Sequence, residues 1–161
     1  MTGTAAAARV WMVNPDSDSV TVFDGAARRA IAEIAVGEQP GTVAIARDGR
    51  LWVSNRRGSS ISVIDPGSLT VVRTVALPPG SQPHGLVADR DSGAVYIALE
   101  AAGRVLRLDS TSFATTGQLD IGSSPRHLAL DRTGARLFVS RFITPALPGE
   151  STATVLSLIH I

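Results

Sequence analysis

The feature that most constrains the fold of this 161-residue chain is an internal repeat. Pro40, Pro83 and Pro125 recur at a spacing of 42 to 43 residues, and each precedes an apolar run followed by an aromatic-centred segment. The aromatic residues at the repeated position are Trp11, Trp52, Tyr96 and Phe138, of which the first belongs to an earlier copy without the proline. Repetition at such a period is typical of folds built from stacked, similar units.

Each unit contains short segments with the character of β-strands. They are rich in β-branched and aromatic residues and are separated by glycine-containing turn signals. A unit of four strands cannot bury both of its faces alone, so stacking of units is required. The sequence therefore predicts an all-β fold, a β-propeller of about three to four blades with four antiparallel strands each. The repeated aromatic residues are predicted to pack between neighbouring blades.

The repeat pattern resembles the YVTN family of β-propeller repeats. The segment LWVSN at 51–55 stands where that family has Tyr-Val-Thr-Asn, and the resemblance covers roughly residues 9–156. Leu99 and Arg141 depart from the family, which has asparagine at their positions, and the fourth unit carries the insertion FITPALPGEST. The resemblance implies a WD-like bacterial scaffold, found in surface-layer and exported proteins and beside quinoprotein, haem and lactonase propellers.

The repeat also predicts how the chain divides. Propellers close with about four to eight blades, so the chain is expected to be a fragment of a seven-bladed protein. The final LSLIHI does not fit the repeat, because Ser157 stands where an aspartate is expected, and this tail should pack poorly or be disordered. The predicted divisions are 1–8 as a disordered or partial strand, blade units at about 9–40, 41–83, 84–125 and 126–156, and an atypical tail at 157–161.

Composition excludes several classes of partner and site. The net charge of +1 favours no nucleic-acid partner, and the absence of cysteine excludes thiolate metal sites and attachment of c-type haem within this chain. No stretch approaches the length of a membrane span and the start has no signal-peptide pattern, so no membrane insertion is expected. The family resemblance implies a periplasmic or extracellular location. No cofactor is expected.

Polar residues at two repeated positions form the candidate binding site. In a propeller, the first strand of each blade starts at the face to which the loop after the second strand returns, so these positions share one rim. Its candidate binding residues are Asn14, Asp16, Asn55, Arg56, Arg57, His84, Glu100, Arg126, His127 and Arg141.

Neither a metal site nor a catalytic residue is predicted on this rim. His84 and His127 lie on adjacent blades without a repeated acidic partner, whereas a metal needs several convergent ligands. His84 is interpreted as a strand-opening residue whose imidazole bonds local backbone, with ligation as the alternative. Asp24, Asp65 and Asp109 end the third segment of successive units, and are predicted to fix the following turn by accepting backbone N–H bonds.

Two functions from different classes follow. The first is a non-catalytic scaffold or binding module, whose rim loops bind a protein, glycan or small-molecule partner. The alternative is a fragment of a propeller enzyme, a lactonase-like hydrolase or a quinoprotein- or haem-associated redox protein, whose other site residues lie in missing blades. The Pro83-His84-Gly85 segment and the Arg141-Phe142 pair favour that alternative. Missing blades or self-association are expected to cover the open apolar faces.

Overall fold

A computed structural model describes residues 8–122, 124–142 and 157–160, which form four antiparallel sheets. The first sheet contains β1–β3, the second β4–β7, the third β8–β11 and the fourth β12–β14. The strands are β1 (Arg9–Asn14), β2 (Ser19–Asp24), β3 (Arg29–Ala35), β4 (Pro40–Ile45), β5 (Leu51–Asn55), β6 (Ser60–Asp65), β7 (Thr70–Ala76), β8 (Pro83–Ala88), β9 (Ala94–Leu99), β10 (Arg104–Asp109), β11 (Thr115–Asp120), β12 (Pro125–Leu130), β13 (Arg136–Arg141) and β14 (Ser157–His160).

The sheets follow the repeat closely. The strands β4, β8 and β12 each begin at a repeated proline, one residue before the predicted blade starts at 41, 84 and 126. Within every sheet, strands that are consecutive in the chain are neighbours in the sheet. The β1 strand carries Trp11 at the position of Trp52 in β5, so the described part of the first sheet begins at the second-strand position.

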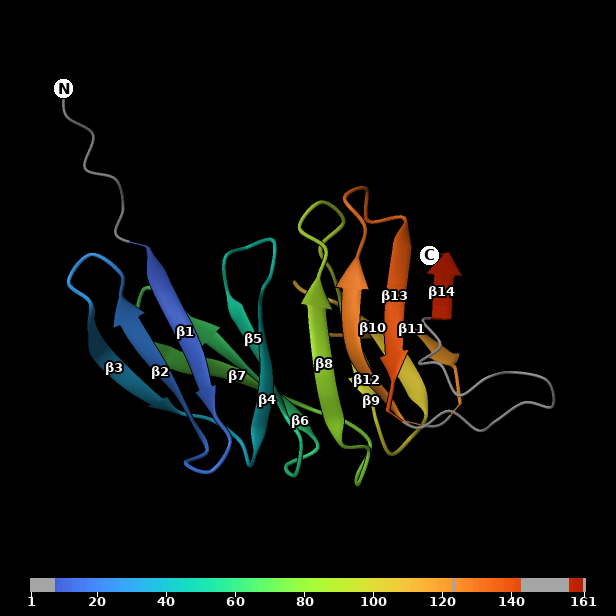
Figure 1. Ribbon diagram of the computed structural model, residues 1–161, viewed down its shortest axis with the longest axis horizontal. Helices are drawn as coiled ribbons and strands as arrows, with labels where there is room; N and C mark the ends of the chain where they lie inside the picture. The colour runs from blue at the N-terminus through green and yellow to red at the C-terminus, as the bar shows by residue number, and fades with distance from the viewer. Residues whose placement is uncertain (1–7, 123, 143–156, 161) are drawn as a thin grey trace.

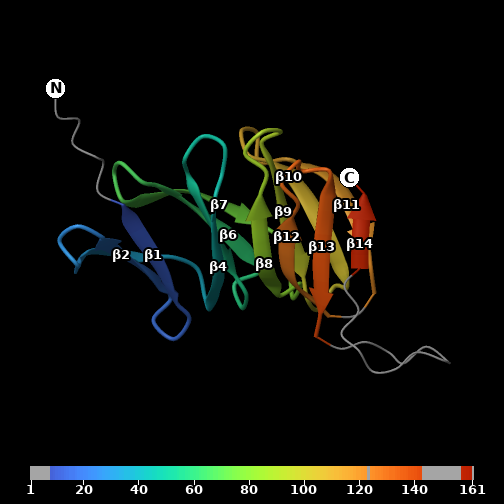
Figure 2. The same cartoon turned by 45° about the horizontal axis from the view of Figure 1, so that its top comes forward.

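The four sheets stack face to face along the molecule. The first strands of the second, third and fourth sheets, β4, β8 and β12, lie side by side (Figures 1 and 2). A strand of each preceding sheet also contacts the next first strand: β1 contacts β4, β5 contacts β8 and β9 contacts β12. This arrangement agrees with the blade stack that the repeat predicts. In the described residues, no helix is long and apolar enough to cross a membrane.

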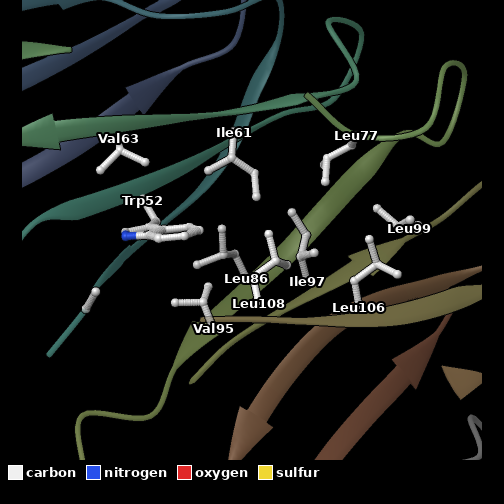
Figure 3. Packing of buried hydrophobic residues seen from close by; sticks show 11 residues of the cluster. Trp52, Ile61, Val63, Leu77, Leu86, Val95, Ile97, Leu99, Leu106 and Leu108 are labelled. Carbon is white, nitrogen blue, oxygen red and sulfur yellow. The ribbon is translucent and has the colours of Figure 1, made fainter. Parts of the chain in front are cut away.

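Apolar side chains fill each space between successive sheets in three clusters. The largest lies between the second and third sheets (Figure 3). Trp52 is fully buried there and stacks on Phe113, with ring centroids 5.5 Å apart. Tyr96 belongs to the cluster between the third and fourth sheets. Trp11 packs against the cluster between the first two sheets. The prediction that these three aromatic residues pack between blades is confirmed. Phe138, at the same position of the fourth sheet, is half-buried.

The repeated aspartates also have the predicted role. The Oδ1 atom of Asp65 accepts hydrogen bonds from the backbone N–H groups of Gly67 and Ser68, both at 2.8 Å. Asp24 and Asp109 accept the equivalent pair of bonds in their own turns. These bonds lower the pKa of all three carboxyls, because they stabilise the charged form.

The chain end differs from its prediction. Residues 157–160 form β14, which pairs with β13 from Arg136 opposite His160 to Val139 opposite Ser157. They occupy the third-strand position of the fourth sheet, although the sequence pattern placed them outside the repeat. The physical reason is that a ladder is formed by backbone groups, which any non-proline residue supplies. Poor packing of the tail stays a prediction, and the segment expected to begin this third strand, at 152–156, lies outside the described residues.

Candidate functional site

The first strands begin, and the second strands end, at one common end of the sheets. In Figure 1 the arrowheads of β1 and β13 and the starts of β8 and β12 lie together at the lower end. We call this end the rim. Backbone hydrogen bonds join its two kinds of segment in three sheets: Arg56 N to Gln39 O, Glu100 N to Gln82 O and Phe142 N to Ser124 O, at 2.9, 3.0 and 2.8 Å.

The residue before each repeated proline has an unusual backbone conformation. Gln39, Gln82 and Ser124 have φ values of 55°, 50° and 56°, in the left-handed region that residues other than glycine rarely adopt. The carbonyl oxygen of each of these three residues accepts the rim hydrogen bond described above. The repeat did not predict this conformation, because a residue before proline ordinarily favours extended backbone.

A chain of ion pairs crosses three sheets at the rim. Glu100, directly after β9, lies 3.3 Å from Nη2 of Arg56, directly after β5, and 3.1 Å from Nη2 of Arg126 in β12. Only 10% of the Glu100 side chain is exposed, whereas the two arginine side chains are 32% and 25% exposed. One buried carboxylate therefore holds two guanidinium groups, and this set of three carries a net positive charge.

Two histidines from adjacent first strands meet beside these ion pairs. The rings of His84 and His127 are 5.0 Å apart, centroid to centroid, in an edge-on arrangement. Burial lowers the pKa of His84 below its ordinary 6.5, His127 and Arg126 lower it further, and Glu100 opposes them. The His84 imidazole is therefore neutral at pH 7. Its Nδ1 atom is buried without a hydrogen-bond partner among the described residues, so the interpretation that it bonds local backbone is wrong at this atom.

Gly85 sets how closely these two strands approach. A Cβ atom placed on Gly85 would lie 2.2 Å from the carbonyl oxygen of Arg126 and 2.9 Å from the Cα of His127. Such distances are too short for any side chain at this position. The absence of a side chain at Gly85 therefore lets the backbones of β8 and β12 come together, and brings His84 next to His127.

An aromatic ring completes this part of the rim. The Cζ atom of Arg126 lies 3.8 Å from the centre of the Phe142 ring, and Phe142 is 62% exposed. Phe142 follows β13, at the position that Arg56 and Glu100 occupy after β5 and β9. It was missing from the ten candidates, although the aromatic residue after Arg141 was noted in the sequence. We call the following set the rim cluster: Arg56, His84, Glu100, Arg126, His127 and Phe142.

The two candidate asparagines form hydrogen bonds within their own sheets. Nδ2 of Asn55, which is fully buried, donates hydrogen bonds to the hydroxyls of Ser60 and Ser62, both at 3.0 Å. Nδ2 of Asn14 donates in the same way to Ser19 and Thr21 at 3.0 and 2.7 Å. Each asparagine therefore braces the hairpin between the second and third strands of its own sheet.

The remaining three candidates are Asp16, Arg57 and Arg141. Asp16 and Arg57 line a depression between the first two sheets, together with Pro15, Asp18, Glu38 and Gln39. Arg141 extends toward the loop after β11, where a Cβ atom on Gly122 would lie 2.7 Å from its Nη2 atom. The structure thus brings together five of the ten sequence candidates. Within residues 8–122 and 124–142, no group of three or more histidine, aspartate or glutamate residues could hold a metal ion.

Comparison with known proteins identifies the fold. No family model matches the chain, and no curated protein matches it. Many solved structures do match. Hydrazine synthase from Kuenenia stuttgartiensis superposes with a TM-score of 0.82 and 19% sequence identity over 99% of this chain. Dihydro-heme d1 dehydrogenase NirN gives a TM-score of 0.69 and 17% identity over 83% of this chain.

A catalytically inactive histidine-to-alanine variant of virginiamycin B lyase from Staphylococcus aureus, with quinupristin, gives a TM-score of 0.71 and 15% identity over 93% of this chain. The chain folds as a partial β-propeller. It spans 49%, 30% and 51% of the lengths of these three structures. At such low identities the likeness establishes the architecture alone.

Proposed function

We propose that this chain is part of a non-catalytic β-propeller that binds its partner at the rim. The observation that carries the proposal is the rim cluster, in which polar side chains from three sheets converge on one partly exposed surface. Propeller blades supply the rigid support that such a site needs, because the cluster residues sit at the ends of strands. The partner is a protein, a glycan or a small molecule.

The finer assignments belong to the same proposal. We propose that the repeat is of the YVTN type and that the protein works in the bacterial periplasm or outside the cell. Val10 and Met12 on β1 are 55% and 47% exposed, and an apolar sheet face of this kind favours association. We propose that further blades or a second copy of the chain cover it. Light scattering of the isolated chain should show oligomers, and a soluble monomer would contradict this.

Hydrogen exchange of the whole chain, read by mass spectrometry, tests binding at the rim. Three probes represent the partner classes: benzoate for small anions, maltotriose for glycans and trialanine for peptides. A binding module predicts that at least one probe slows exchange in segments around 82–86, 100–103 and 125–128. Slowed exchange confined to other segments, or no effect from any probe, would show the proposal to be wrong.

A propeller enzyme is the second candidate. Its support is His84, whose neutral, partly buried imidazole has an unpartnered Nδ1 atom and could accept a proton. The solved structures of similar fold include enzymes and a redox protein. Recovery of each probe after incubation separates the two functions. Consumption of a probe by the chain, lost in His84→Gln, would favour the enzyme.

A further inference from the structure

We propose that the rim cluster is a subsite for an organic carboxylate whose apolar body lies against Phe142. This inference rests on the proposed function, because it names the class of ligand that the rim would bind. Three features of the cluster point to the same chemistry: an excess of partly buried positive charge, a neutral histidine with an unpartnered nitrogen, and an exposed aromatic ring.

The charges of the cluster do not balance. Arg56 and Arg126 share the single carboxylate of Glu100, and the Nε atoms of both arginines, like the Oε2 atom of Glu100, are buried without hydrogen-bond partners in the described part of the chain. Opposite charges attract more strongly in a partly desolvated site than in water. One further anion would neutralise the second guanidinium, so a ligand carrying one negative charge fits this site best.

The arginine geometry favours a carboxylate. A guanidinium group is planar, and it presents its N–H donors in a fork that matches the two oxygens of a carboxylate. In Arg126 one face of the guanidinium lies on the Phe142 ring, which orients the donors. A phosphate dianion would bring more negative charge than the cluster can neutralise, and an uncharged sugar would leave the excess positive charge unpaired.

The neighbouring histidines fit the same ligand. His84 is neutral at pH 7, so it does not add a third full charge, while protonation of its ring would become easier once a carboxylate lies nearby. His127 is exposed and lies against His84, at the open side of the cluster. A hydrogen bond from an imidazole N–H can supplement the contact with Arg126.

Phe142 indicates that the rest of the ligand is apolar. A phenyl ring that is 62% exposed at a polar rim offers a surface for another apolar group. Aromatic rings in contact attract each other beyond the effect of burying their apolar area. The expected ligand therefore has its carboxylate close to an aromatic or other apolar body, as benzoate does.

Equilibrium dialysis of the whole chain against benzoate tests the proposal, with acetate and benzyl alcohol as probes that each carry half of its chemistry. Benzoate should bind saturably and at least about tenfold more tightly than either, because each lacks one contact. The variant Arg126→Gln should weaken benzoate binding about tenfold or more. Phe142→Leu should weaken benzoate binding more than it weakens acetate binding, because only benzoate also loses its aromatic contact.

Arg136→Gln is the matched control, because it removes the same charge from an exposed side chain at the other end of β13. It should leave benzoate binding unchanged. Circular dichroism checks that every variant is folded, and Arg126→Lys replaces Arg126→Gln if the latter is not; it should also weaken binding, because lysine lacks the planar fork.

Each outcome decides between the two proposals. Equal binding by wild type and Arg126→Gln, an equal loss in Arg136→Gln, or no benzoate binding would overturn the carboxylate subsite. If maltotriose or trialanine still slows exchange at the rim, the binding function stands while the subsite fails. If no probe acts at the rim, both are wrong.

Discussion

The interface between the second and third sheets and the rim at its end are built from the same repeat units, yet they follow different rules. In the interface the facing sheets contribute apolar side chains, such as Trp52 and Ile97. At the rim, equivalent first-strand positions carry Gly41, His84 and Arg126. Side chains in the interface must pack against the next sheet, which restricts the residue types there. Side chains at the rim need not pack in this way, so their residue types can differ from unit to unit. We infer that the interface provides stability and the rim provides binding.

The largest expected effect tests the interface. Trp52→Ala should lower the free energy of unfolding by about 3–5 kcal/mol, because it leaves a cavity where a fully buried ring stacked on Phe113. Urea unfolding measures the loss. Trp11→Ala is the matched control and should cost less, since Trp11 is only half-buried. A loss below about 1 kcal/mol for Trp52→Ala would contradict the packed interface.

The close approach of β8 and β12 gives the next largest effect. Gly85→Ala should destabilise the chain by about 1–3 kcal/mol or more, because the new methyl group would meet the backbone of Arg126 and His127. Gly41→Ala on β4 is the control. Its Cβ atom would lie 3.5 Å from the nearest atom, in ordinary contact, so a change within about 0.5 kcal/mol is expected. Equal effects of the two variants in urea unfolding would show that the strands are not this close.

The ion pairs predict a smaller, salt-dependent effect. Glu100→Gln leaves Arg56 and Arg126 facing each other without their shared carboxylate, which should cost about 1–2 kcal/mol after allowance for their partial exposure. Added salt should reduce this loss, because it screens the repulsion between the guanidiniums. Asp120→Asn is the control, since its pair with Arg104 is exposed, and it should change stability by only about a few tenths of a kcal/mol. A salt-independent loss in Glu100→Gln would contradict the shared ion pair.

The smallest effect concerns His84. His84→Gly should leave the fold intact, because the preceding unit has Gly41 at this position. The lowered pKa means that the folded state resists protonation, so wild type should lose stability as the pH falls from about 6.5 toward the folded pKa. The variant should lack this loss. Urea unfolding between pH 7 and pH 5 measures the difference, and parallel pH profiles would show that the His84 pKa is not lowered.

Metal binding provides a second test of the variant His84→Gly. Calorimetric titration of zinc, copper or iron into wild type and His84→Gly should give no stoichiometric binding that depends on His84, because two histidines on adjacent strands are too few ligands. Tight metal binding by wild type that is abolished in His84→Gly would show this interpretation to be wrong and would favour the enzyme as the function.

The sequence predicts the interface better than the rim, for a physical reason. Strand starts, aromatic packing and the turns at Asp24, Asp65 and Asp109 depend on patterns that recur in every unit, so the repeat reveals them. It also indicates which positions share the rim. It does not show that Glu100 would reach both Arg56 and Arg126, because side-chain reach across blades depends on the distance between strands.

The two asparagines are a further case in which the repeat indicates the position of a residue but not the contacts of its side chain. Asn14 and Asn55 look like exposed rim residues by their position after an apolar strand. Their amides instead turn back to hydroxyls on the following strand. The serines and the threonine at alternate positions of that strand were a signal for this brace, since buried amides require hydrogen-bond partners.

Hydrogen exchange of the whole chain with and without benzoate tests the separation of interface and rim most directly. We predict slow exchange in the central strands β5, β6, β9 and β10 whether or not benzoate is present, with benzoate slowing exchange only around 82–86, 100–103 and 125–128. Fast exchange throughout those central strands, or a benzoate effect spread evenly over them, would contradict it.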